Sequence, residues 1–457
     1  MRNPIFTILK ALAIVLVVLG HSGCPEVVKD FVYQFHVPAF FLCAGYFFHT
    51  KYLDDAGTYI GHRFKGLYVP FVTWSVFFLL IHKLLLWLGL LSTSYGNMAG
   101  MVSHAYSWHE FSERLLAIIF NMSGYDDFLC SPFWFFRSLF VGSLLWLLCF
   151  KVGRCLKWLG DDLRITLGVA VSVWALALWQ SVERFDIAGF TGGGYRELTG
   201  LMFIALGFAV REVQRLWCED KTTFAALRPL LSHRAVIVSL PWICTIAALA
   251  ILLVTGCALH PIMTSSSGLA TTALLPVTGL CGFYLLYRLS ALLSHIGGFV
   301  GRALRYMGEN TLYIFAFHFL AFKLVSAIKV GVYGLPWQAV GSHAVVHAYT
   351  DDNFWLFYTL VGVALPLLWI YGYRRLMARH GESIAAVFTL QGLWRILRFI
   401  IRLTVRLIRG TIRGIGRSIK LFGTFCRGMI AATMEREDND EDEEDDEEEE
   451  NVGEEQK

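Results

Sequence analysis

The sequence predicts an all-α protein that crosses a membrane about ten times. Of its 457 residues, 56% are hydrophobic and only 16% are charged, and the mean hydropathy is +0.54. A soluble globular chain has roughly 25% charged residues. These values exclude the soluble classes. The first apolar run is interpreted as a retained span, because no small-residue cleavage site of a signal peptide accompanies it.

Ten apolar runs have the length or composition of membrane spans. A helix needs roughly 20 apolar residues to cross the hydrocarbon core of a bilayer. The sixth run is short, and the second contains Pro38 among polar neighbours. The expected spans are residues 5–20, 31–49, 67–91, 133–151, 163–180, 198–211, 235–255, 267–289, 311–328 and 354–373.

The charges of the connecting loops predict a direction. Alternate loops are rich in Lys and Arg, as in the stretch that holds Lys51, Arg63 and Lys65, whereas the loop 256–266 has no charged residue. Positively charged loops stay in the cytoplasm. Ten spans therefore place both termini in the cytoplasm, with Lys10 toward the cytoplasm and His21 toward the outside.

Composition divides the chain into three segments: a transmembrane domain (1–380), a basic amphipathic cytoplasmic helix (381–434) and an acidic disordered tail (435–457). The tail holds 16 acidic and 2 basic residues, which leaves 20 acidic and 37 basic residues elsewhere. Basic residues recur at helical spacing from Arg395 to Lys420, which predicts a helix on anionic membrane lipids. Packing of this helix on the protein's own loops is the alternative.

The ten cysteines predict no metal site. They form no CxxC motif and no Cys/His cluster at metal spacing, and most lie within apolar runs as small hydrophobic residues. Cys24 and Cys130 fall in loops, where they could pair if that side of the membrane is oxidising.

Two ionisable residues lie on the first span, LKALAIVLVVLGHSG (9–23). Lys10 and His21 are eleven positions apart, which returns them to nearly the same helix face, separated by roughly 16 Å of rise. Charged groups on a span face the protein interior or a watery cavity. We therefore expect both to line one groove. The alternatives are a lysine that reaches the cytoplasmic interface and a histidine that ends the helix as a polar residue at the outer interface.

Polar residues on other spans support a site near His21. FHVPAFFLCAGYFF (35–48) places His36 on the second span, and FWFFRSLF (133–140) opens the fourth span with Trp134 and Arg137. TLYIFAFHFL (311–320) places Tyr313 and His318 on the ninth span. A single buried histidine is more often structural than catalytic, but three histidines and an arginine on separate spans favour a functional site.

The chain resembles the acyltransferase-3 family of integral membrane acyltransferases, which includes bacterial glycan O-acetyltransferases. The matching pieces occur in family order over about residues 5–375. They are Lys10 and His21 as K-x10-H, FHVPAFFLCAGYFF (35–48), HRFKGLYVPF (62–71), FWFFRSLF (133–140) and GENTLYIFAFHF (308–319). The family normally has Arg at the position of Lys10 and a second basic residue at that of Gly66, so this chain departs from it at the CoA side.

The resemblance implies transfer of an acyl group, most often acetyl from acetyl-CoA, to a hydroxyl of a cell-envelope glycan or lipid-linked sugar. It implies a multi-pass protein of the bacterial cytoplasmic (inner) membrane, with acyl-CoA as cosubstrate and no bound cofactor, metal or nucleic-acid partner. Succinyl is another possible acyl group.

The residues suggest a mechanism within this class. We expect His21 and Lys10 to be the catalytic residues, with His21 as general base, and Lys10, Arg63 and Lys65 to bind the phosphates of acyl-CoA. A covalent acyl-histidine intermediate is an alternative route. The expected substrate pocket contains His36, Trp134, Arg137, Tyr313 and His318, with oxyanion stabilisation as a further role of His36, Trp134 and Arg137.

Two other function classes remain open from the sequence. A transporter or flippase of a polysaccharide or lipid precursor would also use charges within the membrane, but such folds often contain internal repeats, and none is evident here. A non-catalytic scaffold would leave Lys10 and His21 in lipid at a free-energy cost with no function.

Overall fold

The computed structural model of the chain consists of helices joined by loops in the part that it describes. These residues are 3–97, 99–156, 160–219, 233–266, 268–349 and 351–387, with the single positions 229, 402, 406, 410 and 424, and no β-strand occurs among them. The chain forms two compact units, Met1–Tyr371 and Gly372–Lys457. The predicted acidic tail and nearly all of the predicted basic helix lie outside the described residues.

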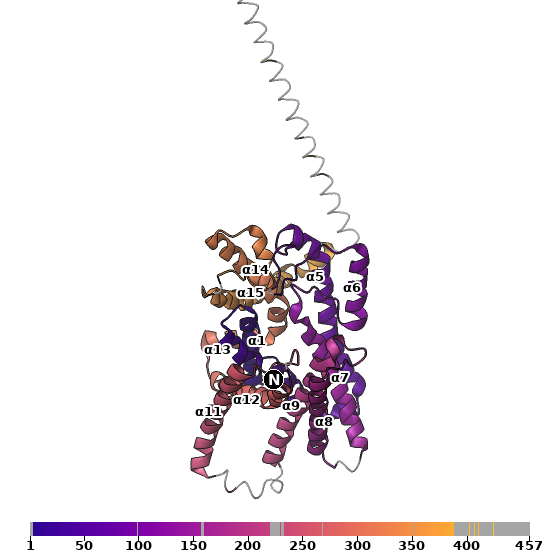
Figure 1. Cartoon of the computed structure of the whole chain (residues 1–457), viewed down its shortest axis with the longest axis vertical. Helices are drawn as coiled ribbons and strands as arrows, with labels where there is room; N and C mark the ends of the chain where they lie inside the picture. The colour runs from indigo at the N-terminus through magenta and orange to yellow at the C-terminus, as the bar shows by residue number, and fades with distance from the viewer. Residues whose placement is uncertain are drawn as a thin grey trace, which may run out of the picture. The chain divides into compact units, whose positions relative to one another are not determined.

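Most of the principal helices of the described residues are labelled in Figure 1. They are α1 (Pro4–His21), α2 (Glu26–Tyr33), α3 (Pro38–Tyr46), α4 (Ala56–Arg63), α5 (Val69–Trp87), α6 (Trp108–Asn121), α7 (Trp134–Cys155), α8 (Asp162–Glu183), α9 (Tyr195–Glu219), α11 (Arg234–Ala258), α12 (Leu269–Leu293), α13 (Gly298–Glu309), α14 (Thr311–Tyr333) and α15 (Phe354–Val387). A single π-helical turn, Phe64–Tyr68, joins α4 to α5.

Eight helices in the described part of the chain are long and apolar enough to cross a membrane. They are Pro4–His21, Ala56–Trp87, Ser131–Cys155, Asp162–Glu183, Val236–Ala258, Leu269–Leu293, Thr311–Tyr333 and Phe354–Arg379. Each overlaps one of the expected spans, so the prediction of a helical membrane protein is confirmed. The count of ten and the orientation of the termini stay predictions.

The other two expected spans take different forms. Residues 31–49 contain a break between α2 and α3, because Pro38 has no N–H to continue the helix. The side chain of Gln34 at this break donates a hydrogen bond to the Leu252 carbonyl oxygen (2.8 Å) and so ties it to α11. Residues 198–211 belong to the longer helix α9, which is more polar than the eight helices named above.

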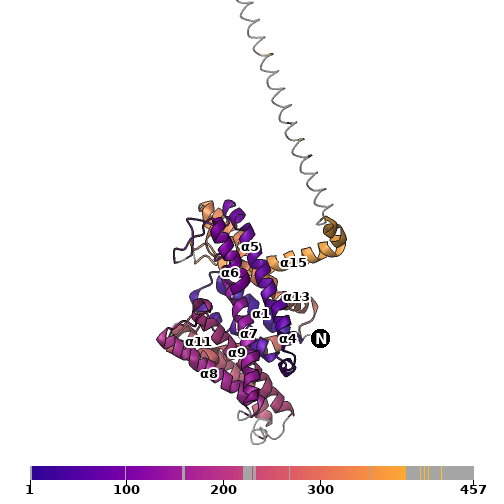
Figure 2. The same ribbon diagram turned by 90° about the vertical axis from the view of Figure 1, so that its right-hand side faces the viewer.

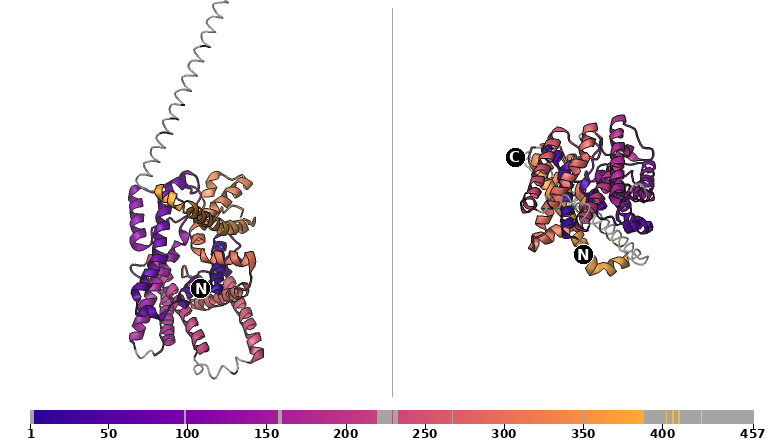
Figure 3. Two further views of the ribbon diagram at one scale, coloured as in Figure 1. Left: turned by 180° about the vertical axis from the view of Figure 1, so that it is seen from behind. Right: turned by 90° about the horizontal axis from the view of Figure 1, so that it is seen from below.

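Helix α1 lies in the interior of the first unit. It begins at Pro4, where the Asn3 side chain accepts a hydrogen bond from the Ile5 N–H (3.0 Å) as an N-cap. It packs against α2, α3, α12, α13 and α14, and its central place is visible in two perpendicular views (Figures 1 and 2). Views from behind and from below show the same helix among its neighbours (Figure 3). The residues of α1 are therefore shielded by protein on several sides.

Glycine residues bring α3 and α9 into close contact. A side chain at Gly45 would collide with the Ile204 carbonyl oxygen, and one at Gly207 would collide with that of Leu42. The two helices run in parallel, because Gly200 lies against Phe41 and Phe208 against Phe48. The starts of α3 and α9 therefore lie at about the same level, and the longer helix α9 continues beyond the end of α3.

The outward faces of the spans are apolar. On α11, Ile246 and Val254 are each 67% exposed and Trp242 is 60% exposed. Contiguous apolar exposure of this kind is unfavourable in water but is expected where lipid replaces solvent. The exposure pattern therefore agrees with the assignment of these helices to a membrane.

We predict that Gly45→Ala destabilises the helix pair α3–α9, because the added methyl group overlaps the Ile204 carbonyl oxygen. Overpacking of this kind costs about 1–3 kcal/mol, and the melting temperature of the detergent-purified protein should fall by several degrees. Gly331→Ala on α14 is the matched control, because its methyl group meets no atom. Equal melting temperatures of the two variants would contradict the packing argument.

Candidate active site

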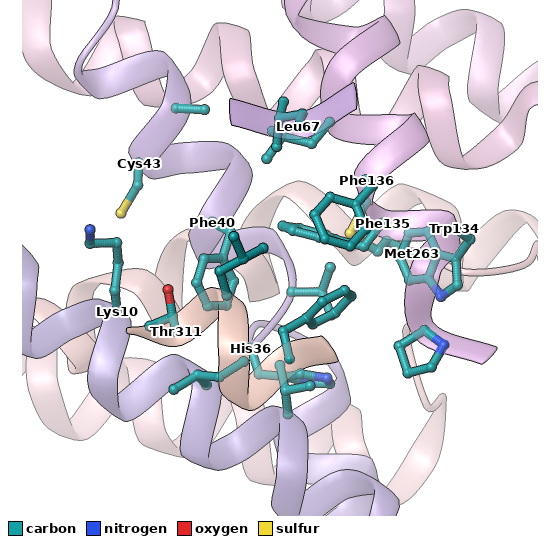
Figure 4. Close-up of a pocket in the computed structure, with 18 of the residues that line it drawn as sticks. Lys10, His36, Phe40, Cys43, Leu67, Trp134, Phe135, Phe136, Met263 and Thr311 are labelled. Carbon is teal, nitrogen blue, oxygen red and sulfur yellow. The ribbon is translucent and has the colours of Figure 1, made fainter. Parts of the chain in front are cut away.

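An elongated cavity of about 390 Å³ lies inside the first unit. Its walls come from α1, α2, α3, the π turn before α5, the start of α7, the loop after α11, and α14. Lys10 and Cys43 lie at one end of the close-up view, and Trp134 and Met263 lie at the other (Figure 4). Most of the lining is apolar, so the few polar side chains determine what the cavity can bind.

Five of the residues predicted from the sequence line this one cavity: Lys10, His21, His36, Arg63 and Trp134. Lys10 and His21 both face it from α1, as the helical spacing indicates. Helix α3 runs antiparallel to α1 and continues the same wall. Cys43 lies beside Lys10, and the residues before Pro38 lie beside His21. The cavity therefore connects a cationic end to an imidazole end.

Three rings surround the imidazole end. Tyr33 donates a hydrogen bond from its hydroxyl to the Gly20 carbonyl oxygen (3.1 Å), and its ring centroid lies 4.9 Å from that of His36 and 6.3 Å from that of His21. His36 Nδ1 lies 2.6 Å from the Val32 carbonyl oxygen. Because a carbonyl only accepts, the neutral His36 ring carries its proton on Nδ1 and presents Nε2 as an acceptor.

His318 lies behind His21 rather than in the cavity wall. The two ring centroids are 5.4 Å apart. His318 Nδ1 faces the carbonyl oxygens of Ile314 (3.1 Å) and Phe315 (2.9 Å), while its Nε2 is buried with no hydrogen-bond partner among the described residues. The neutral ring therefore presents a lone pair, not a proton, at Nε2.

The cationic end is formed by Lys10 of α1 and Arg63 at the end of α4. The Arg63 guanidinium lies 4.9 Å from the Tyr59 ring centroid. The π turn that follows, a feature frequent at functional sites, places Gly66 in the cavity wall. Lys65 is exposed and does not line the cavity.

Sequence reasoning missed a second arginine near this end. Arg211 of α9 donates a hydrogen bond to the Phe48 carbonyl oxygen, and its Nη2 lies 3.5 Å from His49 Nδ1. Phe47, the residue before Phe48, lines the cavity. The only sequence signal was the position of Arg211 in a basic loop, which did not distinguish it from its basic neighbours.

Trp134 forms the end of the cavity opposite Lys10 (Figure 4). The guanidinium of Arg196 lies 4.9 Å from its ring centroid, and Arg196 Nε donates a hydrogen bond to the Thr264 carbonyl oxygen (2.8 Å). Thr264 and Met263, from the loop after α11, complete this end. Sequence reasoning missed Arg196 because it follows a glycine-rich loop and not an apolar motif.

Arg137 and Tyr313 lie outside the cavity lining. Arg137 is buried, donates to the Gly189 carbonyl oxygen (3.3 Å) and lies 3.8 Å from a Glu197 carboxylate oxygen. Ser138 also donates to this carboxylate (3.4 Å). Tyr313 packs against Trp74, with ring centroids 6.3 Å apart. Glu197, a partner that sequence reasoning missed, therefore holds Arg137 within the helix bundle.

Two buried lysines of α14 hold the loop that follows it. Lys323 Nζ donates to the carbonyl oxygens of Val340 (3.1 Å) and Ser342 (2.5 Å), and Lys329 Nζ lies 2.9 Å from Asp352. The same loop carries His343, whose ring centroid is 5.5 Å from that of Phe319. The Phe319 ring in turn lies 5.2 Å from that of His21. This loop therefore covers the His21 region.

A second buried network holds the loop before α7. His82 of α5 places Nδ1 2.5 Å from an Asp126 carboxylate oxygen and Nε2 2.8 Å from the His104 carbonyl oxygen. Burial opposes ionisation of Asp126, but the hydrogen bond and charge of His82 outweigh it and lower the pKa of this carboxyl. The network fixes the segment whose Phe128 ring lies 5.5 Å from that of His343.

The described residues contain no group of three or more His, Cys, Asp or Glu arranged to hold a metal ion. Cys24 and Cys130 are both buried free thiols, so the pairing considered from the sequence is absent. The polar groups in the cavity lining are two imidazoles, two cations, an indole, the Cys43 thiol and the hydroxyls of Tyr33, Thr264 and Thr311.

The described residues form a helical bundle with eight helices suited to a membrane and an internal cavity that joins a cationic end to an imidazole end, which defines the class as a helical membrane protein. Residues 3–373 match the family described as "Acyltransferase domain", and the chain belongs to this acyltransferase-3 family. The protein is thus a membrane acyltransferase, and the resemblance inferred from the motifs is confirmed. Comparisons with curated proteins and with solved structures gave no match.

We predict a specific acid sensitivity from His343. Burial, and then the charge of Lys323, lower the pKa of His343 to about 4, whereas an unfolded histidine titrates near pH 6.5. Between these values the unfolded chain binds more protons, so stability falls as the pH decreases from about 6.5 to about 4.

The melting temperature of His343→Gln in detergent should therefore fall less over this pH range than that of the unchanged protein. His109→Gln, at an exposed position on α6, should retain the full fall. Parallel pH profiles for the His343 variant and the unchanged protein would refute the assignment.

Proposed function

We propose that this protein transfers an acyl group, acetyl in the first instance, from acyl-CoA to a hydroxyl of a cell-envelope glycan or lipid-linked sugar. The observation that carries the proposal is the single cavity that contains Lys10 and Arg63 at one end and His21 and His36 at the other. A donor with a phosphorylated head and a long thin arm matches this distribution of charge. The proposed setting is a bacterial cytoplasmic membrane, with the Lys10 end toward the cytoplasm.

The donor is proposed to bind through its phosphates at Lys10 and Arg63. Charge-assisted hydrogen bonds from cations to phosphate are strong, and the planar Arg63 guanidinium can bind two oxygens at once. Lys65 lies outside the cavity, so its contribution is limited to a weaker long-range attraction. The pantetheine arm would follow α1 toward His21 and bring the thioester to the imidazole end.

His21 is the proposed general base. Its imidazole accepts the proton of the acceptor hydroxyl while the hydroxyl oxygen attacks the thioester carbonyl carbon. The carbon–sulfur bond then breaks, and the departing CoA sulfur takes the proton from the His21 imidazolium. A direct transfer of this kind balances without a cofactor or metal, and an acyl-histidine route would use the same residue as nucleophile.

The neighbouring residues support different parts of this reaction. Neutral His36 presents an acceptor at Nε2, which suits it to orient the acceptor hydroxyl rather than to stabilise an oxyanion. Arg137 is held away from the cavity by Glu197, so its proposed role is to position α7. His318 presents a buried lone pair close to the His21 ring and would orient that ring.

We predict that His21→Ala lowers acyl transfer by about 10²–10⁴-fold, the usual contribution of a general base. Purified protein in detergent would be mixed with acetyl-CoA and a cell-envelope glycan extract, and both CoA release and acetylated product would be measured. His109→Gln, at an exposed position, is the control. A folded His21→Ala protein that transfers at the unchanged rate would eliminate the assignment, and acceptor movement without CoA release would favour a transporter.

We predict that Arg63→Gln raises KM for acetyl-CoA about tenfold, because it removes one charge-assisted contact with phosphate. KM for acetyl-pantetheine, which has no phosphate, should stay unchanged. Lys10→Gln should behave in the same way, and Lys65→Gln should have a smaller effect. An equal rise in KM for both donors would show that Arg63 shapes the cavity and does not bind phosphate.

A further inference from the structure

A cation that the acyl-transfer steps do not use, Arg196, lies next to the end of the cavity formed by Trp134. Arg196 is half-buried on the first turn of α9, and its guanidinium lies over the Trp134 ring at 4.9 Å. Its Nε donates to the Thr264 carbonyl oxygen at 2.8 Å. Arg196 does not itself line the cavity, but it contacts two residues that do, Trp134 and Thr264.

The parallel packing of α3 and α9 places Arg196 at the His21 end. Gly200 lies against Phe41, and Arg211 reaches the Phe48 carbonyl oxygen at the other end of the pair. Arg196, one turn before Gly200, therefore lies level with the start of α3. His36 lies immediately before that start.

No ion pair within the described part of the chain includes Arg196. The adjacent carboxylate of Glu197 is directed to Arg137 and Ser138 instead. The hydrogen bond through Nε fixes the plane of the Arg196 guanidinium. Its two terminal nitrogens make no hydrogen bond in the described residues. These two nitrogens can therefore bind a carboxylate or phosphate in bidentate fashion.

We propose that Arg196 and Trp134 form an acceptor subsite for an anionic sugar, with Trp134 stacking on the sugar face and Arg196 binding its carboxylate or phosphate. This inference rests on the proposed function and narrows the acceptor class to acidic glycans or sugars that carry phosphate. A sugar held there presents a neighbouring hydroxyl to the His21 end of the cavity. An indole suits the apolar face of a sugar ring, and the arginine selects charge.

The test is a binding measurement that needs no acyl transfer. The full chain in detergent would be titrated by calorimetry with methyl β-D-glucuronide and with methyl β-D-glucoside. The two sugars differ only at C6, which is a carboxylate in the first and a hydroxymethyl group in the second. The unchanged protein should bind the glucuronide about tenfold more tightly, as one charge-assisted pair predicts. Arg196→Gln should remove this preference and retain affinity for the glucoside, and Arg196→Lys should be intermediate because it loses the bidentate geometry.

Arg184→Gln, at an exposed position after α8, is the matched control and should keep the preference. If Arg196→Gln lost affinity for both sugars equally, its role would be structural and the subsite would be refuted. No measurable preference in the unchanged protein would also overturn the proposal.

Two further measurements distinguish a lipid headgroup from a sugar and the subsite from the acyl-transfer function. If phosphatidylglycerol in nanodiscs, compared with phosphatidylcholine alone, abolishes the Arg196-dependent preference, the bound anion is a lipid headgroup and the acceptor assignment is wrong. Intact acyl transfer without Arg196-dependent binding would refute only the subsite. Arg196-dependent binding with no CoA release would instead refute only the acyl-transfer function.

Discussion

The need to shield a charged side chain from lipid is the constraint on which the rest of this structure depends. Lys10 and His21 lie on an apolar helix, and an ionised group in hydrocarbon costs several kcal/mol unless protein or water surrounds it. The fold meets this cost by placing α1 in the interior, against five other helices. An elongated cavity then runs along α1 beside both side chains, so this helix forms a wall of the site.

Close helix packing determines the shape of that cavity. Hydrophobic burial contributes little to contacts between helices in a membrane, where small residues allow backbones to approach instead. Gly45 and Gly207 bring α3 onto α9, which aligns one end of the pair with Trp134 and the other with Lys10. The aromatic rings of Phe40, Phe135 and Phe315 fill the space between the ends. The middle of the cavity is therefore apolar, and polar side chains lie toward its ends.

Buried polar groups outside the cavity hold the loops that cover it. Lys323 and Lys329 place ammonium groups against loop carbonyl oxygens and Asp352, and His82 places both ring nitrogens against acceptors. Buried ionic groups of this kind contribute little net stability, but removing one partner is costly. Their effect here is to fix two loops, one that carries Phe128 and one that carries His343. The rings of Phe128 and His343 pack together, and His343 also packs on Phe319 of α14, which lies against His21.

The amino-acid sequence by itself determined the membrane class, the approximate positions of eight spans and the common face of Lys10 and His21. Each depends on local hydropathy or on the 3.6-residue period of one helix, which a single segment carries. Motif order also indicated the family. By contrast, only tertiary packing decided which polar residues meet. Arg137 and Trp134, three positions apart, separate toward Glu197 and toward the cavity. His318 lies behind His21 rather than beside the cavity, and Arg196 joins Trp134 from 62 positions away. Contacts between distant segments depend on how whole helices pack against one another, and no local pattern in the sequence encodes that geometry.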